Sequence, residues 1–392
     1  NTKITRENKN PKNYLDMEQT NRMSLDAYSP AGLPVPVAVP SPDPFMGSPT
    51  DGLFGNMNEI GNSDTSMDNE ISTLKSQGYA TGLASALVRS NRANHPIRIW
   101  VVDNSGSMSI GDGTCVADGG GPSNFKTVSC SRWEELRDTV EYHAQLAELI
   151  SAPTSFRLLN NTSGGSPEFS VGKNIGDAER AKDIMMGAMP GGATPLVEHI
   201  QKIRSDVLDM APGLRAKGQQ AVIVIATDGL PTDSYGQGGA EEQAHFTSAM
   251  RSLEGLPVWV VVRLCTDAES VREFYNDLDS NLELSLEVID DFVSEAVEVH
   301  RYNPWLNYCR PLHRAREFGV RDMVFDHIDE RRLQKKGLRD LCFTLFGDET
   351  LKKIDPDVNW REFSEKVKFL VEKEGLNYNP ARKKETPWID IK

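Results

Sequence analysis

An acidic residue and two serines at alternate positions follow an apolar run early in the chain. Residues 97–102 read Ile-Arg-Ile-Trp-Val-Val, and Asp103, Ser105 and Ser107 come directly after them. A short apolar run bounded by turn residues is typical of a buried strand in a parallel sheet. Ligands bind beyond the carboxyl ends of such strands. One carboxylate and two hydroxyls supply only oxygen atoms, which are the ligands that hard divalent cations prefer.

Two further polar residues follow turn or strand signals later in the chain. Thr194 lies in the sequence Pro-Gly-Gly-Ala-Thr-Pro, where the glycines permit a tight bend. We expect Thr194 at the N-cap of a helix whose first residue is Pro195. Asp228 comes shortly after residues 221–226, an apolar run that we predict to be a central strand.

The periodicity of the surrounding sequence predicts a doubly wound α/β sheet. Strands are expected over residues 97–102, 155–159, 168–171, 221–226, 258–264 and 282–288. Helices are expected over residues 79–92, 133–150, 177–189, 195–210, 241–253, 268–278 and 291–300. Alternating strands and helices with short connections indicate a mainly parallel sheet flanked by helices. The Asp-x-Ser-x-Ser string, Thr194 and Asp228 then converge at the ends of strands.

Composition divides the chain into three regions. Residues 1–75 are rich in polar residues, proline and glycine, so we predict a disordered N-terminal tail. Residues 76–302 form the sheet domain. Residues 303–392 show helical periodicity without clear strands, and we expect a C-terminal helical extension that is either a small domain or a clasp on the sheet domain.

The overall charge and the cysteine count exclude several classes of protein. The net charge of −14 argues against binding to nucleic acid or to an anionic membrane. No signal peptide or apolar run of about 20 residues is present, so we expect no membrane span and a cytoplasmic location. Cys115 and Cys130 flank one loop and could pair in a secreted protein, but reduced thiols are the favoured interpretation.

Taken together, Asp103-x-Ser105-x-Ser107, Thr194 and Asp228 resemble the metal-ion-dependent adhesion site of the von Willebrand factor A (VWA) domain family. The resemblance covers about residues 76–302 and implies a Rossmann-like fold that binds Mg²⁺, or Mn²⁺ or Ca²⁺. It also implies that the two serine hydroxyls bind the cation directly, with the threonine joining when a ligand is engaged. The two aspartates would act mostly through bound waters. One coordination position would stay open for an acidic residue of a protein partner.

The expected function is therefore a divalent-cation-dependent protein-binding module, of the adhesion or scaffold kind, and not an enzyme. In a purely structural alternative, Asp103 caps a turn, the serine hydroxyls bond to the backbone and Asp228 belongs to an ordinary turn. A Mg²⁺-dependent phosphatase is less favoured, because Ser105 stands where such an enzyme has its general acid. The chain could also be the adaptor of an ATP-driven complex, since it lacks the phosphate-binding loop of the motor itself. The Gly-rich insertion over residues 109–131 could cover or tune the site.

Overall fold

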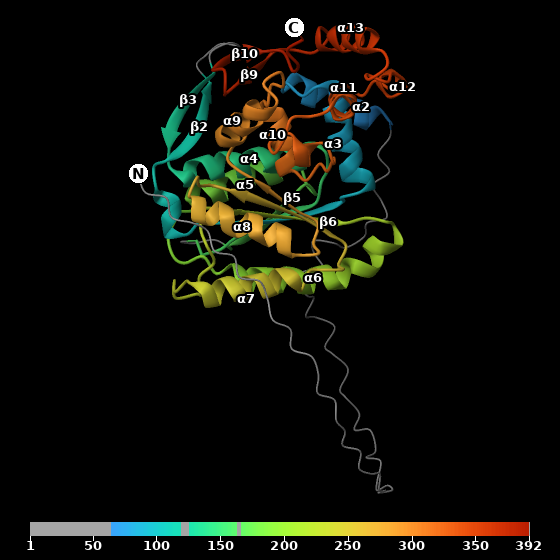
Figure 1. Ribbon diagram of the computed structural model, residues 1–392. Helices are drawn as coiled ribbons and strands as arrows, with labels where there is room; N and C mark the ends of the chain where they lie inside the picture. The colour runs from blue at the N-terminus through green and yellow to red at the C-terminus, as the bar shows by residue number, and fades with distance from the viewer. Residues whose placement is uncertain (1–63, 119–124, 163–165, 392) are drawn as a thin grey trace, which may run out of the picture. The chain divides into compact units, whose positions relative to one another are not determined.

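A six-stranded, mainly parallel sheet forms the centre of the computed structural model, which describes residues 64–118, 125–162 and 166–391 (Figure 1). The strand order is β5-β4-β1-β6-β7-β8. The strands are β1 (Ile97–Val102), β4 (Thr154–Leu158), β5 (Glu168–Val171), β6 (Ala221–Thr227), β7 (Val258–Leu264) and β8 (Leu286–Ile289). Strands β4, β1, β6, β7 and β8 pair in parallel, whereas β5 runs antiparallel to β4. The predicted fold class is confirmed.

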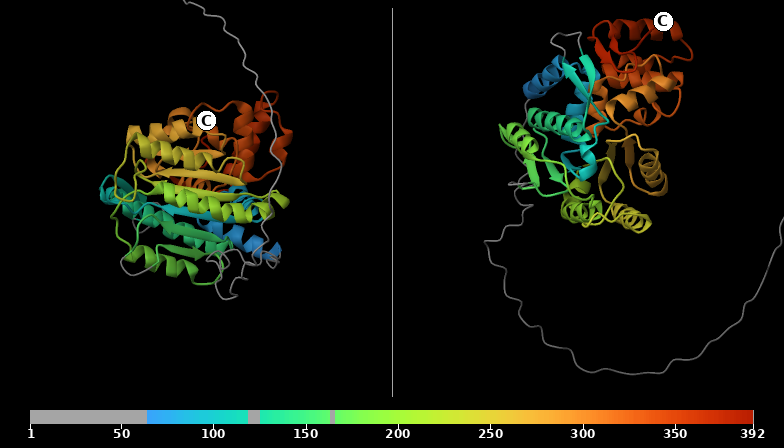
Figure 2. Two further views of the ribbon diagram at one scale, coloured as in Figure 1. Left: turned by 90° about the horizontal axis from the view of Figure 1, so that it is seen from below. Right: turned by 90° about the vertical axis from the view of Figure 1, so that its left-hand side faces the viewer.

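Helices cover both faces of the sheet (Figure 2). One face carries α6 (Leu196–Ala216), α7 (Ala240–Arg251) and α8 (Glu269–Asn281), and the other carries α3 (Thr81–Ala93), α4 (Arg132–Leu149), α5 (Asp177–Gly187) and α9 (Phe292–Tyr302). Successive side chains of a strand point to opposite faces. In β1, Ile99 and Val101 therefore join the core beneath α6 to α8, while Trp100 and Val102 join the core on the other face.

The last residues of the predicted N-terminal tail are helical in the structure, not disordered. Helix α2 (Asp64–Ser76) occupies residues 64–75, which were expected to be disordered, whereas residues 1–63 lie outside the described part of the chain. Leu74 of α2 is fully buried, and Met67 and Ile71 pack against the same core. This stripe of three apolar side chains at helical spacing gives the helix enough buried surface to fold onto the sheet domain.

The Gly-rich insertion contains a β-hairpin rather than an irregular loop. Strands β2 (Gly113–Asp118) and β3 (Phe125–Cys130) pair antiparallel, and residues 119–124 between them are not described. Cys115 and Cys130 form a disulfide across the hairpin. The expectation that these two thiols are reduced is therefore wrong. The register of the hairpin brings two cysteines that are 15 residues apart into contact.

The C-terminal region is a clasp on the sheet domain rather than a separate domain. Its elements are α10 (Arg310–Glu317), α11 (Lys335–Phe346), α12 (Thr350–Lys353), α13 (Trp360–Val371) and a short hairpin of β9 (Asn377–Asn379) and β10 (Lys384–Thr386). The buried side chains of Leu312, Leu341 and Trp388 belong to the same core as Trp100 of β1. Gly319, with φ +85°, approaches β6 so closely that a Cβ would lie 2.6 Å from a methyl group of Val222.

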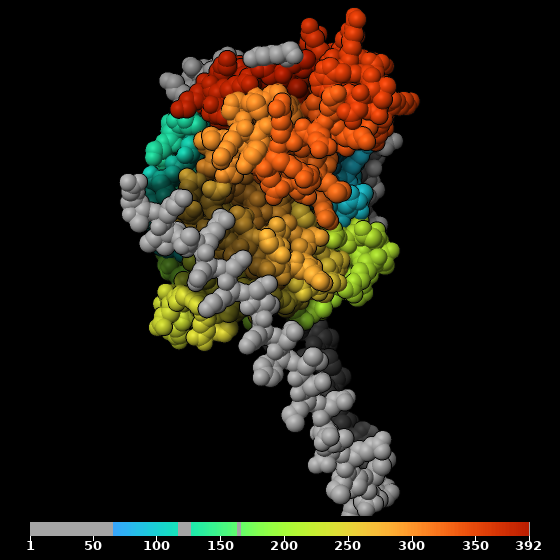
Figure 3. Space-filling view, viewed as in Figure 1, coloured from blue at the N-terminus to red at the C-terminus, as the bar shows by residue number. Residues whose placement is uncertain are grey.

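The outer edge of β8 borders a pocket of about 540 Å³ whose lining is mostly acidic. Its carboxylates come from α8, β8, the turn after β8, α9 and the segment after α10, namely Asp279, Glu287, Asp290, Glu295, Glu298, Asp326, Asp329 and Glu330. In Figure 3, the gold surface of α8 lies below the orange surface of the residues that follow α10. Burial raises the pKa of Asp290 to about 7.

We predict that Trp388→Ala destabilises the whole domain, because Trp388 is 1 % exposed and fills the core that the C-terminal region shares with the sheet. Removing a buried tryptophan side chain costs about 3–5 kcal/mol of the free energy of unfolding. Urea unfolding monitored by circular dichroism measures the loss. Trp360→Ala, at a position that is 46 % exposed, is the matched control and should lose much less. A separate early transition in Trp388→Ala, with the main transition unchanged, would contradict the shared core.

Candidate metal centre

The two predicted carboxylates follow neighbouring strands, so the sheet places them at one edge. Strands β1 and β6 pair in parallel with Val102 opposite Ala226. The backbone N–H of Asp103 donates to the carbonyl of Ala226 at 2.9 Å and so extends this ladder by one residue. Asp103 is fully buried, and Asp228 is 3 % exposed. Both carboxylates therefore lie at the carboxyl end of the sheet, where α/β proteins bind their ligands.

A chain of hydrogen bonds joins four of the five predicted site residues. Asp103 Oδ1 accepts from the backbone N–H of Ser105 at 2.8 Å, and the hydroxyls of Ser105 and Ser107 are 3.1 Å apart. Ser107 Oγ donates to Asp228 Oδ1 at 2.8 Å. Ser105 is buried, whereas Ser107 is exposed. The chain of polar groups therefore runs from the buried end of β1 to the surface.

Backbone hydrogen bonds hold the loop before α6 against the loop that follows β1. The N–H of Gly106 donates to the carbonyl of Gly192 at 3.1 Å, and the N–H of Gly191 donates to the carbonyl of Asn104 at 2.7 Å. Gly192 has φ +93°, and a Cβ there would lie 2.4 Å from Asn160 Oδ1. Asn160 follows β4, so both this contact and the positive φ favour glycine at position 192.

Thr194 does not cap a helix as the sequence predicted. Pro195 is the N-cap of α6 and makes no side-chain capping bond. The backbone N–H of Thr194 donates to Thr232 Oγ1 at 2.9 Å, and its carbonyl accepts from the N–H of Thr232 at 3.0 Å. Its hydroxyl lies 3.9 Å from the point that a Cβ on Gly229, the residue after Asp228, would occupy. The loop therefore brings Thr194 to the same end of the sheet as the other four residues.

Burial and a neighbouring carboxylate disfavour the ionised form of Asp103. Burial, and after it the charge of Asp228, raise the pKa of Asp103 to about 6, although hydrogen bonds from Thr227 and Ser105 act in the opposite direction. Two carboxylates close together raise the free energy of the doubly ionised state. A cation between them would relieve this repulsion.

Arg132, which the sequence analysis did not single out, forms an ion pair with Asp228. Its Nη1 lies 2.9 Å from Asp228 Oδ2, and its Nε and Nη2 lie 2.7 Å and 2.6 Å from the two carboxylate oxygens of Asp112. The Arg132 side chain is 11 % exposed. The hydrogen bond from Arg132 lowers the pKa of Asp112. Both oxygens of Asp228 therefore have a partner, Ser107 on one and Arg132 on the other.

Thr227 is the second residue that the sequence analysis missed. Its hydroxyl donates to Asp103 Oδ2 at 2.6 Å, and it is fully buried. Its position as the residue directly before Asp228 is a signal that the sequence does contain. Arg132 offers no such signal, because its position at the site depends on contacts with Asp112 and Ile110 across the insertion.

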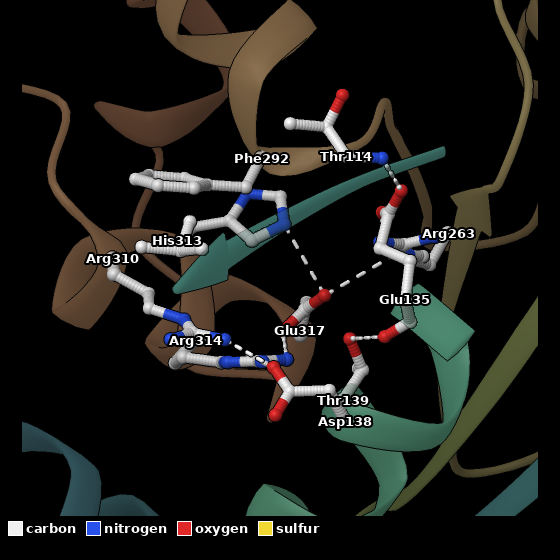
Figure 4. A pocket seen from close by; sticks show the side chains of 11 residues that line it. Thr114, Glu135, Asp138, Thr139, Arg263, Phe292, Arg310, His313, Arg314 and Glu317 are labelled. Carbon is white, nitrogen blue, oxygen red and sulfur yellow. Dashed lines mark hydrogen bonds and ion pairs between the residues drawn. The ribbon is translucent and has the colours of Figure 1, made fainter. Parts of the chain in front are cut away.

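A buried ionic cluster anchors the same helix, α4, to the sheet and to the C-terminal region (Figure 4). Glu135 accepts from the backbone N–H of Thr114 in β2 at 2.9 Å and forms an ion pair with Arg263 of β7. Arg263 also lies 3.4 Å from Glu317 of α10, which is 2.9 Å from Arg314. Burial alone would raise the pKa of Glu317, but Arg314 and its other polar neighbours hold it well below the usual range. The cluster therefore joins the hairpin, α4, the sheet and the C-terminal region.

Neither a protein-family model nor a curated protein matches this chain. Over the described ranges, no three or more His, Cys, Asp and Glu side chains form a group that could hold a metal ion. The candidate centre has two carboxylates, and its remaining side-chain oxygens are hydroxyls. No helix among the described residues is both long enough and apolar enough to cross a membrane.

We predict that Thr227→Val destabilises the protein by about 1–3 kcal/mol, because it leaves a carboxylate oxygen of the buried Asp103 without its 2.6 Å donor. Urea unfolding in a buffer that contains a chelator measures this loss of the free energy of unfolding. Thr227→Ser is the matched control, since it keeps the hydroxyl and removes only a methyl group. Equal losses in the two variants would mean that the hydrogen bond to Asp103 contributes nothing.

Proposed function

We propose that this chain is a VWA-like module that binds a protein partner through a divalent cation, and that it is not an enzyme. The observation that carries the proposal is the continuous chain of contacts from Asp103 through Ser105 and Ser107 to Asp228. Asp228 lies 121 residues after Ser107 in the sequence, and both follow strands that end at the same edge of the sheet. Their convergence supports a common ligand for all of them.

The chemistry of the donor set fits Mg²⁺, and also Mn²⁺ or Ca²⁺. All the side-chain donors are oxygen atoms, which hard cations prefer. In the proposed site the hydroxyls of Ser105, Ser107 and Thr194 hold the cation directly, and Asp103 and Asp228 hold its bound waters. The burial of Asp103 beside the charge of Asp228 supports this assignment, because a nearby cation would stabilise the ionised carboxylate.

The proposed partner is a protein that presents an acidic residue. A cation held by Ser105, Ser107 and Thr194 would supply a Lewis acid that could bind the carboxylate of that residue. Ser107 and Gly106 are exposed, so the loop after β1 offers a partner access to such a cation. Mg²⁺ keeps several water molecules when it binds to few protein carboxylates, so one of them can be exchanged.

The environment of Asp103 supports a binding module over a phosphatase. A carboxylate nucleophile needs an oxygen that a substrate can reach. Asp103 is fully buried, and its two oxygens accept hydrogen bonds from Ser105 and Thr227. A generic phosphatase substrate with Mg²⁺ should therefore give no turnover above background.

We predict that Asp103→Ala and Ser105→Ala each abolish binding of Mg²⁺, because each removes an oxygen or a charge from the proposed site. Isothermal titration calorimetry with Mg²⁺ measures the binding. Ser109→Ala is the matched control, since Ser109 is exposed in the same loop, at the end of η1 (Gly106–Ser109), and should leave the affinity unchanged. A wild-type protein that binds none of Mg²⁺, Mn²⁺ and Ca²⁺ would refute the proposed function.

Partner binding is tested by a pull-down with and without EDTA. The wild-type protein should retain acidic partners in Mg²⁺ and release them in EDTA, and Asp103→Ala should retain none in either buffer. Circular dichroism confirms that the variant is folded. Partner binding that survives EDTA unchanged would show that the interaction uses a different surface.

A further inference from the structure

The first residue of α4 brings a permanent positive charge to the candidate centre. Ser131 and Glu134 form a capping box that starts the helix, and the backbone N–H of Arg132 donates to the carbonyl of Ile110 at 3.0 Å. This hydrogen bond fixes Arg132 against the loop that follows the Asp-x-Ser-x-Ser string. Its guanidinium lies between Asp228, whose side chain is fully buried, and Asp112, whose side chain is 53 % exposed.

The contact of Arg132 with Asp228 stabilises a buried carboxylate. Asp228 accepts one hydrogen bond from Arg132 through its second oxygen, while the first oxygen already accepts from Ser107. A buried carboxylate is strongly destabilising unless it is paired. Arg132 therefore satisfies Asp228 without a metal ion, and it keeps the Ser107–Asp228 pair assembled in that state.

We propose that Arg132 is a positioning residue that acts as the internal counter-ion of the site and sets its affinity for a divalent cation. This inference rests on the proposed function. When no cation is bound, Arg132 holds Asp228 in place. When a cation binds, the positive charge of Arg132 repels it, so the affinity is lower than the oxygen donors alone would give.

The β-hairpin determines how strongly this charge acts. Asp112 immediately precedes β2, and Arg132 comes shortly after β3, so the two ends of the insertion meet in their ion pair. The disulfide between Cys115 and Cys130 joins the two strands close to that pair. Asp112 shares the charge of Arg132 with Asp228, so losing Asp112 leaves the full charge facing the cation. The hairpin therefore contributes to setting the affinity of the site for a divalent cation.

The test compares Arg132→Gln and Asp112→Asn in the full chain, with two readouts. One is the melting temperature in chelator, and the other is the Kd for Mg²⁺ from titration calorimetry. We expect Arg132→Gln to lower the melting temperature of the cation-free protein and to tighten the Kd about tenfold or more, because a like charge has gone. Asp112→Asn should instead weaken Mg²⁺ binding. Arg132→Lys should restore a Kd close to that of the wild type, since it keeps the charge.

Arg137→Gln is the matched control, because Arg137 lies on the same helix and pairs with Glu141 at 3.9 Å. It should change neither readout. An unchanged or higher Kd for Mg²⁺ in Arg132→Gln would overturn the inference and leave the proposed function standing. If Arg132→Gln does not fold, the Asp112→Asn variant decides the question. A Kd of that variant equal to or lower than the wild-type Kd overturns the inference. If titration calorimetry detects no binding of a divalent cation to the wild-type protein, both proposals are refuted.

Discussion

The placement of two carboxylates at the ends of adjacent parallel strands is the constraint on which the site depends. Asp103 and Asp228 follow β1 and β6, which lie side by side in the middle of the sheet. Buried negative charges at such a position are costly unless other groups compensate them. The hydroxyls of Ser107 and Thr227, the N–H of Ser105 and the guanidinium of Arg132 provide this compensation. Much of the local structure can be understood as the means of pairing and orienting these two carboxylates.

The sequence was informative wherever a residue's position follows from a strand. The apolar runs at 97–102 and 221–226 predicted β1 and β6, and a polar residue that follows a parallel strand must lie at one edge of the sheet. This is why Asp103, Ser105, Ser107 and Asp228 could be grouped in advance. For Thr194 the sequence predicted the end of the sheet but not the hydrogen bonds. The residues around it fit a helix cap equally well, whereas in the structure its backbone N–H donates to Thr232.

The features that the sequence did not reveal depend on pairing between distant segments. The register of β2 with β3 brings Cys115 to Cys130 and Asp112 to Arg132, and no local pattern specifies that register. The same holds for the C-terminal region. Its helical periodicity was visible, but its role as a clasp follows from long-range contacts such as that of Gly319 with Val222. Local propensity cannot encode contacts of this kind.

The acidic pocket beside β8 has a consequence for association between copies of the protein. An edge strand presents unpaired backbone groups that can add a strand from another chain. Around β8, carboxylates from α8, α9 and the clasp far outnumber the two arginines in the pocket lining. A second identical sheet approaching edge to edge would meet the same negative charges. Electrostatic repulsion therefore protects this margin from fibril-like stacking, and the protection should weaken in acidic or high-salt solution, where those carboxylates are neutralised or screened.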